Sequence, residues 1–192
     1  MAVNAGISGA RLLSDGMGDS ALARFDRDVL AVPGVRAVVL LLGINDIAWP
    51  GTPFAPNDPP ARFEAITAGY RALVERAHAG GIRVIAGTLT PFAGALPGTP
   101  LAASYYSPSK DLLRRQVNAW IRESGTFDAV VDFDRALQDP AAPNQLAARF
   151  DSGDRLHPGD AGNRAMADAF DFAALRDRRA RAARSRVRKS RD

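Results

Sequence analysis

The feature that most constrains the fold is an uninterrupted apolar run, Ala37–Leu42, which ends at Gly43. Its length suits a β-strand, whereas a helix of a globular domain needs about 10 residues or more. A strand without polar positions is typical of a parallel sheet that is buried on both faces. Parallel neighbours need long crossover connections, and these are usually helices. The run therefore predicts an α/β fold.

The rest of the chain alternates in the same way between short apolar runs and longer stretches of helical spacing. The expected strands besides Ala37–Leu42 are Val3–Ala5, Arg83–Leu89 and Ala129–Phe133, and the expected helices are Ala21–Leu30, Ala61–Ala79, Ser109–Glu123 and a last helix from Gly159 onward. This alternation predicts a mostly parallel sheet in one α/β domain, since 192 residues fall within the usual size of a single domain. We expect this domain to span residues 1–175.

The positive charge is concentrated at the C-terminus. Residues 176–192 carry a net charge of +7, whereas residues 1–175 sum to −3. We expect this basic tail to be the solvated end of the last helix or a disordered segment. The alternative is a contact with nucleic acid or an anionic surface. No aromatic residue lies among the arginines to stack on bases, so nucleic acid is not the expected partner.

Several classes of protein are excluded by composition. The chain has no cysteine, which rules out disulfides, thiolate catalysis and cysteine-ligated metals. No apolar stretch approaches the roughly 18–20 residues of a membrane span. Residues 1–20 contain no basic segment followed by an apolar core, so we expect no signal peptide in this chain. The compartment stays open.

Two long loops rich in proline and glycine, Ile47–Pro60 and Thr90–Pro108, follow predicted strands. Ligands of open α/β sheets bind at the carboxyl ends of the strands. Loops of this length in a compact domain are usually functional or disordered. We expect both loops to face a substrate.

The most specific motif is Asp154-Arg155-Leu156-His157-Pro158, just before the last predicted helix. A carboxylate three residues before a histidine, on a turn closed by proline, can reach the imidazole Nδ1. It would then fix the tautomer and stabilise the imidazolium during proton transfer. Taken alone, His157 fits a structural role equally well. The other histidine, His78, falls at a predicted helix C-terminus, where a partial positive charge suits the helix dipole, and we interpret it as structural.

Two further blocks contain groups that can donate hydrogen bonds: Asn4–Gly9 and Gly43–Asp46. A glycine exposes its N–H to close approach, and an asparagine amide adds a second donor. Such donors, aimed at a developing oxyanion, are worth roughly 3–4 kcal/mol each. Each block alone is common turn chemistry. Their order along an α/β chain, ahead of the Asp-x-x-His-Pro motif, favours an oxyanion hole.

Together these blocks resemble those of the SGNH (GDSL-type) hydrolases, a family of esterases and lipases, from residue 3 to about residue 172. The resemblance implies a flavodoxin-like three-layer α/β/α sandwich that hydrolyses carboxylic esters by serine acyl transfer, with no metal and no cofactor. It implies that the Gly9 N–H and the Asn45 amide are oxyanion donors, that His157 is the general base, and that Asp154 orients it. The implied substrate is a small ester: an acylated sugar, a lipid or an aryl ester.

The nucleophile is where the chain departs from the family. The family's Gly-Asp-Ser block precedes the block matched by Asn4–Gly9, and this chain begins after that point. Gly18-Asp19-Ser20 follows the matched block and has no apolar strand before it. A nucleophile needs a rigid strand-to-helix turn, so we expect Ser20 to start a helix instead. Ser8 and Ser152 lack this setting too, and are expected to form loop hydrogen bonds.

We therefore expect an N-terminally truncated hydrolase with little or no esterase activity in the chain as given. The alternative is a non-catalytic module of the same fold that keeps the cleft and binds a ligand. The family's first strand lies between the next two strands, so its omission leaves Val3–Ala5 and Ala37–Leu42 either separated by a gap or paired directly. An unfilled gap would expose apolar side chains and unpaired backbone groups.

Overall fold

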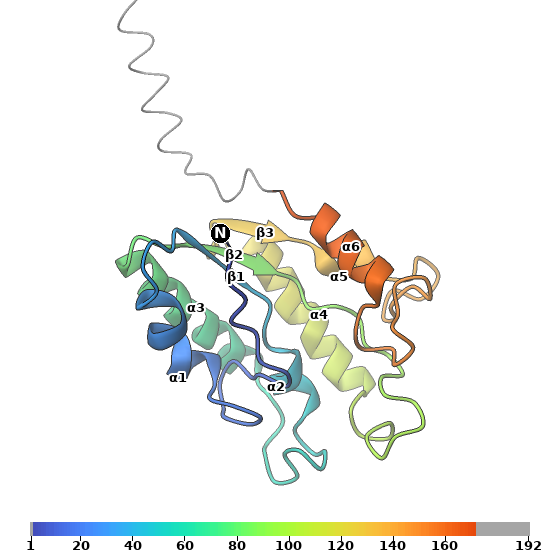
Figure 1. The fold of residues 1–192 in the computed structure, drawn as a ribbon. Helices are drawn as coiled ribbons and strands as arrows, with labels where there is room; N and C mark the ends of the chain where they lie inside the picture. The colour runs from blue at the N-terminus through green and yellow to red at the C-terminus, as the bar shows by residue number, and fades with distance from the viewer. Residues whose placement is uncertain (1, 172–192) are drawn as a thin grey trace, which may run out of the picture.

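The computed structural model describes residues 2–171. Its elements are α1 (Ala21–Phe25), the π-helix η1 (Asp26–Leu30), β1 (Ala37–Leu40), α2 (Ile44–Ala48), α3 (Phe63–Ala79), β2 (Arg83–Gly87), α4 (Pro108–Glu123), β3 (Ala129–Val131), α5 (Phe133–Leu137) and α6 (Asp160–Asp168). They form an α/β fold around a sheet of order β1-β2-β3 (Figure 1). The basic tail, residues 176–192, lies outside the described residues.

All three strands are parallel, as the apolar run predicts. Val38 of β1 lies opposite Val84 of β2, and Ile85 of β2 lies opposite Ala129 of β3. The carboxyl ends of the strands therefore share one edge of the sheet. The α/β class with a parallel sheet, expected from the sequence, is confirmed.

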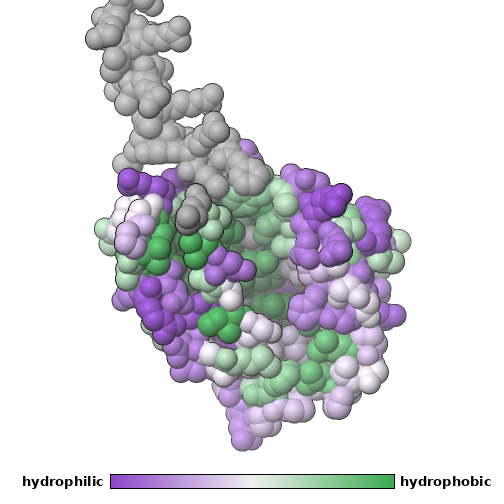
Figure 2. Space-filling view, viewed as in Figure 1, coloured by the Kyte–Doolittle hydropathy of each residue, from purple (hydrophilic) through white to green (hydrophobic). Residues whose placement is uncertain are grey.

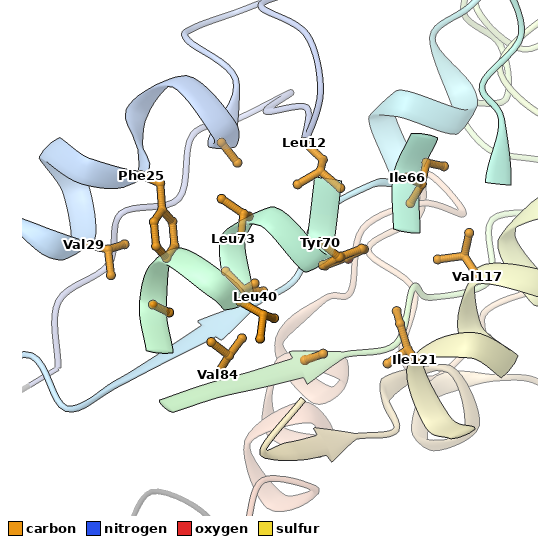
Figure 3. Packing of buried hydrophobic residues seen from close by; sticks show 14 of the residues in the cluster. Leu12, Phe25, Val29, Leu40, Ile66, Tyr70, Leu73, Val84, Val117 and Ile121 are labelled. Atoms are coloured by element: carbon orange, nitrogen blue, oxygen red, sulfur yellow. The ribbon is translucent and has the colours of Figure 1, made fainter. Parts of the chain in front are cut away.

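Helices cover both faces of the sheet. Val84 and Ala86 belong to a large apolar cluster with α1, η1, α3 and α4, part of which Figure 3 shows. Successive side chains of a strand point to opposite faces, so Ile85 points the other way. There it packs with Phe133 of α5 and Met166 of α6. The result is three layers, with the sheet in the middle.

The helix boundaries follow local sequence signals. Ser107 precedes α4, and its side chain accepts the N–H of Lys110 at 3.2 Å, while Pro108 occupies the first helical position. The chain leaves α3 through Gly80 and Gly81, the latter with a φ of +69°. The expected helix at residues 21–30 is also present, although its second half has π-helical hydrogen bonding. Within residues 2–171, no helix is long and apolar enough to cross a membrane.

The expected strand at Val3–Ala5 is wrong. Residues 2–7 form no strand, and Val3 is 72% exposed. A strand exists only where a neighbour takes up its backbone groups, and within residues 2–171 no strand pairs with the outer edge of β1. The carbonyl of Ala5 instead accepts a hydrogen bond from Arg24 of α1 at 2.6 Å. The segment therefore neither fills nor closes the outer side of the sheet.

The expectation that β1 is buried on both faces is half wrong. Leu40 is 4% exposed on the side of α1 and α3, whereas Val39 and Leu41 are 44% and 42% exposed on the other. On that other side, α5 and α6 pack over β2 and β3 rather than over β1. Figure 2 shows apolar side chains gathered in a hollow on this face. The predicted exposure of apolar side chains along this strand is therefore found.

Candidate active site

Asp154 and His157 are in direct contact. Oδ2 of Asp154 lies 2.6 Å from Nδ1 of His157, on the turn that precedes α6. The other carboxylate oxygen, Oδ1, accepts the backbone N–H of Leu156 at 2.9 Å and that of His157 at 2.8 Å. With Nδ1 engaged by the carboxylate, Nε2 is the ring nitrogen left to take up a proton. The His157 side chain is 66% exposed, and its Nε2 has no hydrogen-bond partner within the described residues.

A second acidic residue shapes the same turn. Oδ1 of Asp151 accepts the N–H of Gly153 at 3.0 Å and that of Arg155 at 2.8 Å. Arg155 takes up the left-handed conformation, with a φ of +58°. The N–H of Ser152 donates to the carbonyl of His157 at 3.0 Å and closes the turn. The geometry of the Asp154–His157 pair is thus built almost entirely from neighbours in sequence, which is why the motif could be recognised there.

The pKa of Asp154 keeps this carboxylate ionised. Partial burial acts to raise the pKa, but the hydrogen bonds from the His157 side chain and from the two backbone N–H groups outweigh it and bring the pKa to about 2. Asp154 is therefore negatively charged at neutral pH, and it can stabilise an imidazolium at His157.

Asn45 and Gly9 lie side by side. Asn45 lies in the first turn of α2, which begins directly after Gly43. The φ of Gly43 is +102°, and this left-handed conformation turns the chain away from the direction of β1. Its Nδ2 donates to the carbonyl of Ala10 at 3.0 Å, so the amide contacts the residue after Gly9. Within residues 2–171, no acceptor takes the N–H of Gly9. The structure thus places the Asn45 amide against the residue that follows Gly9, 35 positions away in the sequence.

Gly9 is needed for a steric reason. Its φ is +68°, and a Cβ atom there would lie 2.7 Å from the sulfur of Met17 and 2.8 Å from the ring of Trp49. Any other residue would be strained in this backbone conformation and would also displace one of these side chains.

The neighbouring Asp46 has a role that the sequence did not reveal. This buried carboxylate accepts the N–H of Leu12 at 2.7 Å and that of Leu13 at 2.9 Å. Burial raises the pKa of Asp46, against the hydrogen bonds from the two N–H groups. Asp46 therefore ties α2 to the chain just after Gly9 and fixes the relative position of the two candidate donors. Acidic residues after strands are common in turns, and nothing in the sequence alone marks this one.

Tyr105 is the second residue that sequence reasoning missed. Its hydroxyl lies 2.9 Å from Oδ1 of Asn45, and its side chain is buried. Burial raises the pKa of Tyr105 to about 12; Trp49 acts against the rise, and the charge of Asp154 adds to it. The phenol therefore contacts Asn45 directly, and the charge of Asp154 also acts on its pKa.

Tyr105 belongs to the long loop after β2, for which a substrate-facing role was expected. The same loop contacts the Asp154 turn directly, because the N–H of Leu96 donates to the carbonyl of Asp154 at 2.7 Å. The loop thus contacts both the Asp154 turn, through Leu96, and Asn45, through Tyr105. Its role in substrate contact stays a prediction.

The serines are placed largely as predicted. Ser20 is buried, and its Oγ accepts the N–H of Ala23 at 3.3 Å, so it caps α1. Its expected role at a helix start is confirmed. Ser8 and Ser152 are exposed in loops, but the expected hydrogen bonds of their hydroxyl groups are not found within residues 2–171. Among residues 2–171, no serine hydroxyl lies within hydrogen-bond distance of His157.

His78 contacts an aspartate, and the described residues contain no cluster of side chains suited to a metal ion. Nε2 of His78 lies 2.9 Å from Oδ2 of Asp128, at the C-terminal end of α3, which fits the predicted structural role. Among residues 2–171, no three histidine, aspartate or glutamate side chains are grouped so as to hold a metal ion.

Comparison with known proteins assigns the chain to a family. The model of the GDSL-like lipase/acylhydrolase family matches residues 1–165, most of the chain. The chain belongs to this family. Membership confirms the resemblance seen in the sequence and makes the protein a hydrolase of ester bonds by family. A search of curated proteins gave no match.

Solved structures of an acetylxylan esterase and of a GDSL-like lipase share the fold. An acetylxylan esterase, Axe2 from Geobacillus stearothermophilus, is 25% identical with a TM-score of 0.60; the match covers 90% of this chain and 71% of that one. A GDSL-like lipase from Bacteroides thetaiotaomicron is 20% identical with a TM-score of 0.62, over 80% of this chain and 68% of that one. The comparison with this lipase supports the fold alone.

Proposed function

We propose that this GDSL-family protein carries the general-base half and the oxyanion-binding half of a serine ester-hydrolase site. In this proposal His157 is the base, Asp154 orients it, and the Gly9 N–H and the Asn45 amide hold the oxyanion. The observation that carries the proposal is the 2.6 Å contact between Asp154 and His157, with Nε2 of His157 free among the described residues.

The chemistry follows from these positions. Nε2 of His157 accepts the proton of a serine hydroxyl as the serine oxygen attacks the ester carbonyl. The negative charge that develops on the carbonyl oxygen is held by the N–H of Gly9 and by a hydrogen of the Asn45 amide. The imidazolium then gives its proton to the leaving alcohol. Water repeats the sequence on the acyl-enzyme and releases the acid.

None of the serines that the structure describes reaches His157, and this supports the proposal that the nucleophile is not among them. We therefore expect the chain as given to show little or no esterase activity, and a serine on a preceding strand would be needed for full acyl transfer. The alternative function, binding of an ester ligand without turnover, is favoured by the same observation.

The substrate class is a small ester: an acylated sugar, a lipid or an aryl ester. Of these, an acetylated sugar has the most support, since the acetylxylan esterase from Geobacillus stearothermophilus shares 25% identity over 90% of this chain.

Labelling by a fluorophosphonate probe tests the missing nucleophile. We expect no labelling of the full chain, and hydrolysis of p-nitrophenyl acetate at the rate of the His157→Ala variant. Labelling that disappears in Ser20→Ala or Ser8→Ala would show that one of these serines is the nucleophile. Calorimetric titration with acetylated xylo-oligosaccharides then tests the alternative function: binding without release of acetate supports a ligand-binding module, and absence of binding contradicts it.

A further inference from the structure

We infer that Tyr105 is a positioning residue that fixes the orientation of the Asn45 amide, so that Asn45 presents a hydrogen to the oxyanion. The inference rests on the proposed function, in which Asn45 is an oxyanion donor. Its basis is the hydrogen-bond chain from the Tyr105 hydroxyl to Oδ1 of Asn45, and from Nδ2 of Asn45 to the carbonyl of Ala10.

The directions of these hydrogen bonds allow only one arrangement. The carbonyl of Ala10 can only accept, so the amide group that faces it at 3.0 Å must be the NH2 of Asn45. Oδ1 of Asn45 then faces Tyr105, and because Oδ1 can only accept, the phenol must donate at 2.9 Å. A flipped amide would place two acceptors, Oδ1 and the Ala10 carbonyl, against each other. Tyr105 and Ala10 together lock the amide.

Tyr105 itself is firmly held. It is 2% exposed, and its ring packs edge-on against the fully buried Phe92, with 6.4 Å between the ring centroids. Since burial raises the pKa of Tyr105 to about 12, the hydroxyl keeps its proton and stays a donor at any pH at which the protein would work.

A lysine fixes the distance between the two elements that carry Tyr105 and Asn45. Nζ of Lys110 donates to the carbonyl of Ala48, in the last turn of α2, at 2.6 Å. It also donates to the carbonyl of Ser104, just before Tyr105, at 2.7 Å. Both acceptors are neutral, and burial lowers the pKa of Lys110. Lys110 thus joins the loop of Tyr105 to the helix of Asn45 independently of the tyrosine hydroxyl.

The consequence concerns the second Nδ2 hydrogen of Asn45. One hydrogen is used by Ala10, and within residues 2–171 no protein group accepts the other. The NH2 group that carries this hydrogen contacts the residue after Gly9, and the N–H of Gly9 is also without an acceptor within residues 2–171. Donation by the phenol into Oδ1 polarises the amide and strengthens its N–H groups as donors. A donor held in place before the reaction stabilises the oxyanion without reorganisation.

The test compares Tyr105→Phe with Tyr106→Phe in the full chain, labelled with 15N. Tyr106 is the matched control, because it is adjacent, half-buried, and its hydroxyl accepts only a long 3.3 Å hydrogen bond from Asn144. The probe is acetate, whose carboxylate resembles the oxyanion. Its binding is followed on the side-chain NH2 signals of Asn45 and on the backbone signal of Gly9.

We expect acetate to bind wild type and Tyr106→Phe alike, and to bind Tyr105→Phe roughly 3- to 10-fold more weakly, the factor for the loss of one ordinary hydrogen bond. Hydrogen exchange of the Asn45 NH2 should rise by a similar factor. The NH2 signals of Asn118, whose amide binds the backbone of Leu89 through both its atoms, should not change and so report an intact fold.

Equal acetate affinity in Tyr105→Phe and Tyr106→Phe would overturn the inference and leave the proposed function standing. A wild type in which acetate shifts neither Gly9 nor Asn45 would overturn the oxyanion roles themselves, and the positioning role with them. If Tyr105→Phe loses the Asn118 signals, 3-fluorotyrosine at position 105 replaces it. That residue keeps the shape and is a stronger donor, so the Asn45 signals should move in the direction of a stronger hydrogen bond; unchanged signals would contradict the inference.

Discussion

At the scale of single residues, the site depends on groups whose protonation and backbone conformation are unusual. Asp154 has a pKa of about 2 because His157 and two backbone N–H groups hydrogen-bond its charged form. Gly9 holds a left-handed conformation between two large side chains. Each of these features makes a specific substitution informative.

Asp154→Asn should change how stability depends on acid. The folded pKa of about 2 lies below the unfolded value of 3.8, so the unfolded chain takes up the proton first. The stabilisation by Asp154 is therefore fully present above pH 4 and is lost as the pH falls toward 2. Urea unfolding between pH 7 and pH 2.5 should show a smaller acid loss in Asp154→Asn than in wild type.

The control for this measurement is Glu123→Gln, which removes an exposed carboxylate at the end of α4. We expect it to keep the acid dependence of the wild type. A curve for Asp154→Asn that also parallels the wild type down to pH 2.5 would show that the Asp154–His157 contact does not stabilise the folded chain.

Gly9→Ala should be more destabilising than Gly51→Ala. Both glycines have a positive φ, +68° and +79°, so both substitutions strain the backbone by about 1 kcal/mol. Only at Gly9 does the new methyl group also meet Met17 and Trp49, at 2.7 and 2.8 Å; at Gly51 there is no atom within 4 Å. Thermal unfolding should give a cost larger by about 1–3 kcal/mol at Gly9. Equal costs would show that Met17 and Trp49 move aside freely.

At the scale of secondary-structure elements, α4 and α5 are joined by a buried network of charges. Arg114 of α4 is 1% exposed and contacts Asp111 at 2.8 Å and Asp134 of α5 at 2.5 Å. It also donates to the carbonyl of Leu89 at 3.0 Å, just before the loop that carries Tyr105. The network therefore joins α4, α5 and the segment that follows β2, from which the loop of Tyr105 continues.

Arg114→Met should cost about 3–5 kcal/mol of unfolding free energy, because it removes the buried cation between two buried carboxylates and leaves each with only a more exposed arginine, Arg115 or Arg122. Arg115→Met is the matched control: Arg115 is the next residue, is 60% exposed, and contacts Asp111 at 3.2 Å. Its loss should cost less than about 1 kcal/mol. Chemical denaturation measures both. A cost below 1 kcal/mol for Arg114→Met would show that the pairing only offsets the desolvation of its members.

At the scale of the whole molecule, the sheet has one open side. Within residues 2–171, β1 pairs only with β2, and Val39 of β1 and Leu41 just after it are 44% and 42% exposed. An unpaired strand edge beside apolar side chains favours association with other chains. The open side is therefore the surface at which self-association should begin.

Val39→Lys should lower concentration-dependent association and leave stability nearly unchanged. A charged side chain at an exposed edge blocks the approach of another strand, and an exposed substitution usually changes stability by within about 0.5 kcal/mol. Leu112→Lys, at a position 49% exposed on α4, is the control and should associate like wild type. Sedimentation velocity over a range of concentrations measures the effect. Equal association of the two variants would place the contact elsewhere.

The fold could be predicted from sequence where the signal was local. The apolar run at Ala37–Leu42, the cap at Ser20 and the start of α4 after Ser107 all appear close to where they were expected. The strand at Val3–Ala5 failed because a strand depends on a partner, and a short apolar stretch does not say whether one is present. The short helices α2 and α5 were missed because five residues are too few to show helical periodicity.

In the candidate site, too, contacts between sequence neighbours could be predicted, whereas contacts between distant residues could not. The contact between Asp154 and His157 was determined by the sequence alone, because residues three apart on one turn meet through local backbone hydrogen bonds. The tertiary structure alone decided that Tyr105 donates to Asn45, 60 residues away, since no periodicity or motif links the two. Only packing decides such a contact: the parallel sheet brings the carboxyl ends of β1 and β2 to one edge, and the segments that follow them then meet.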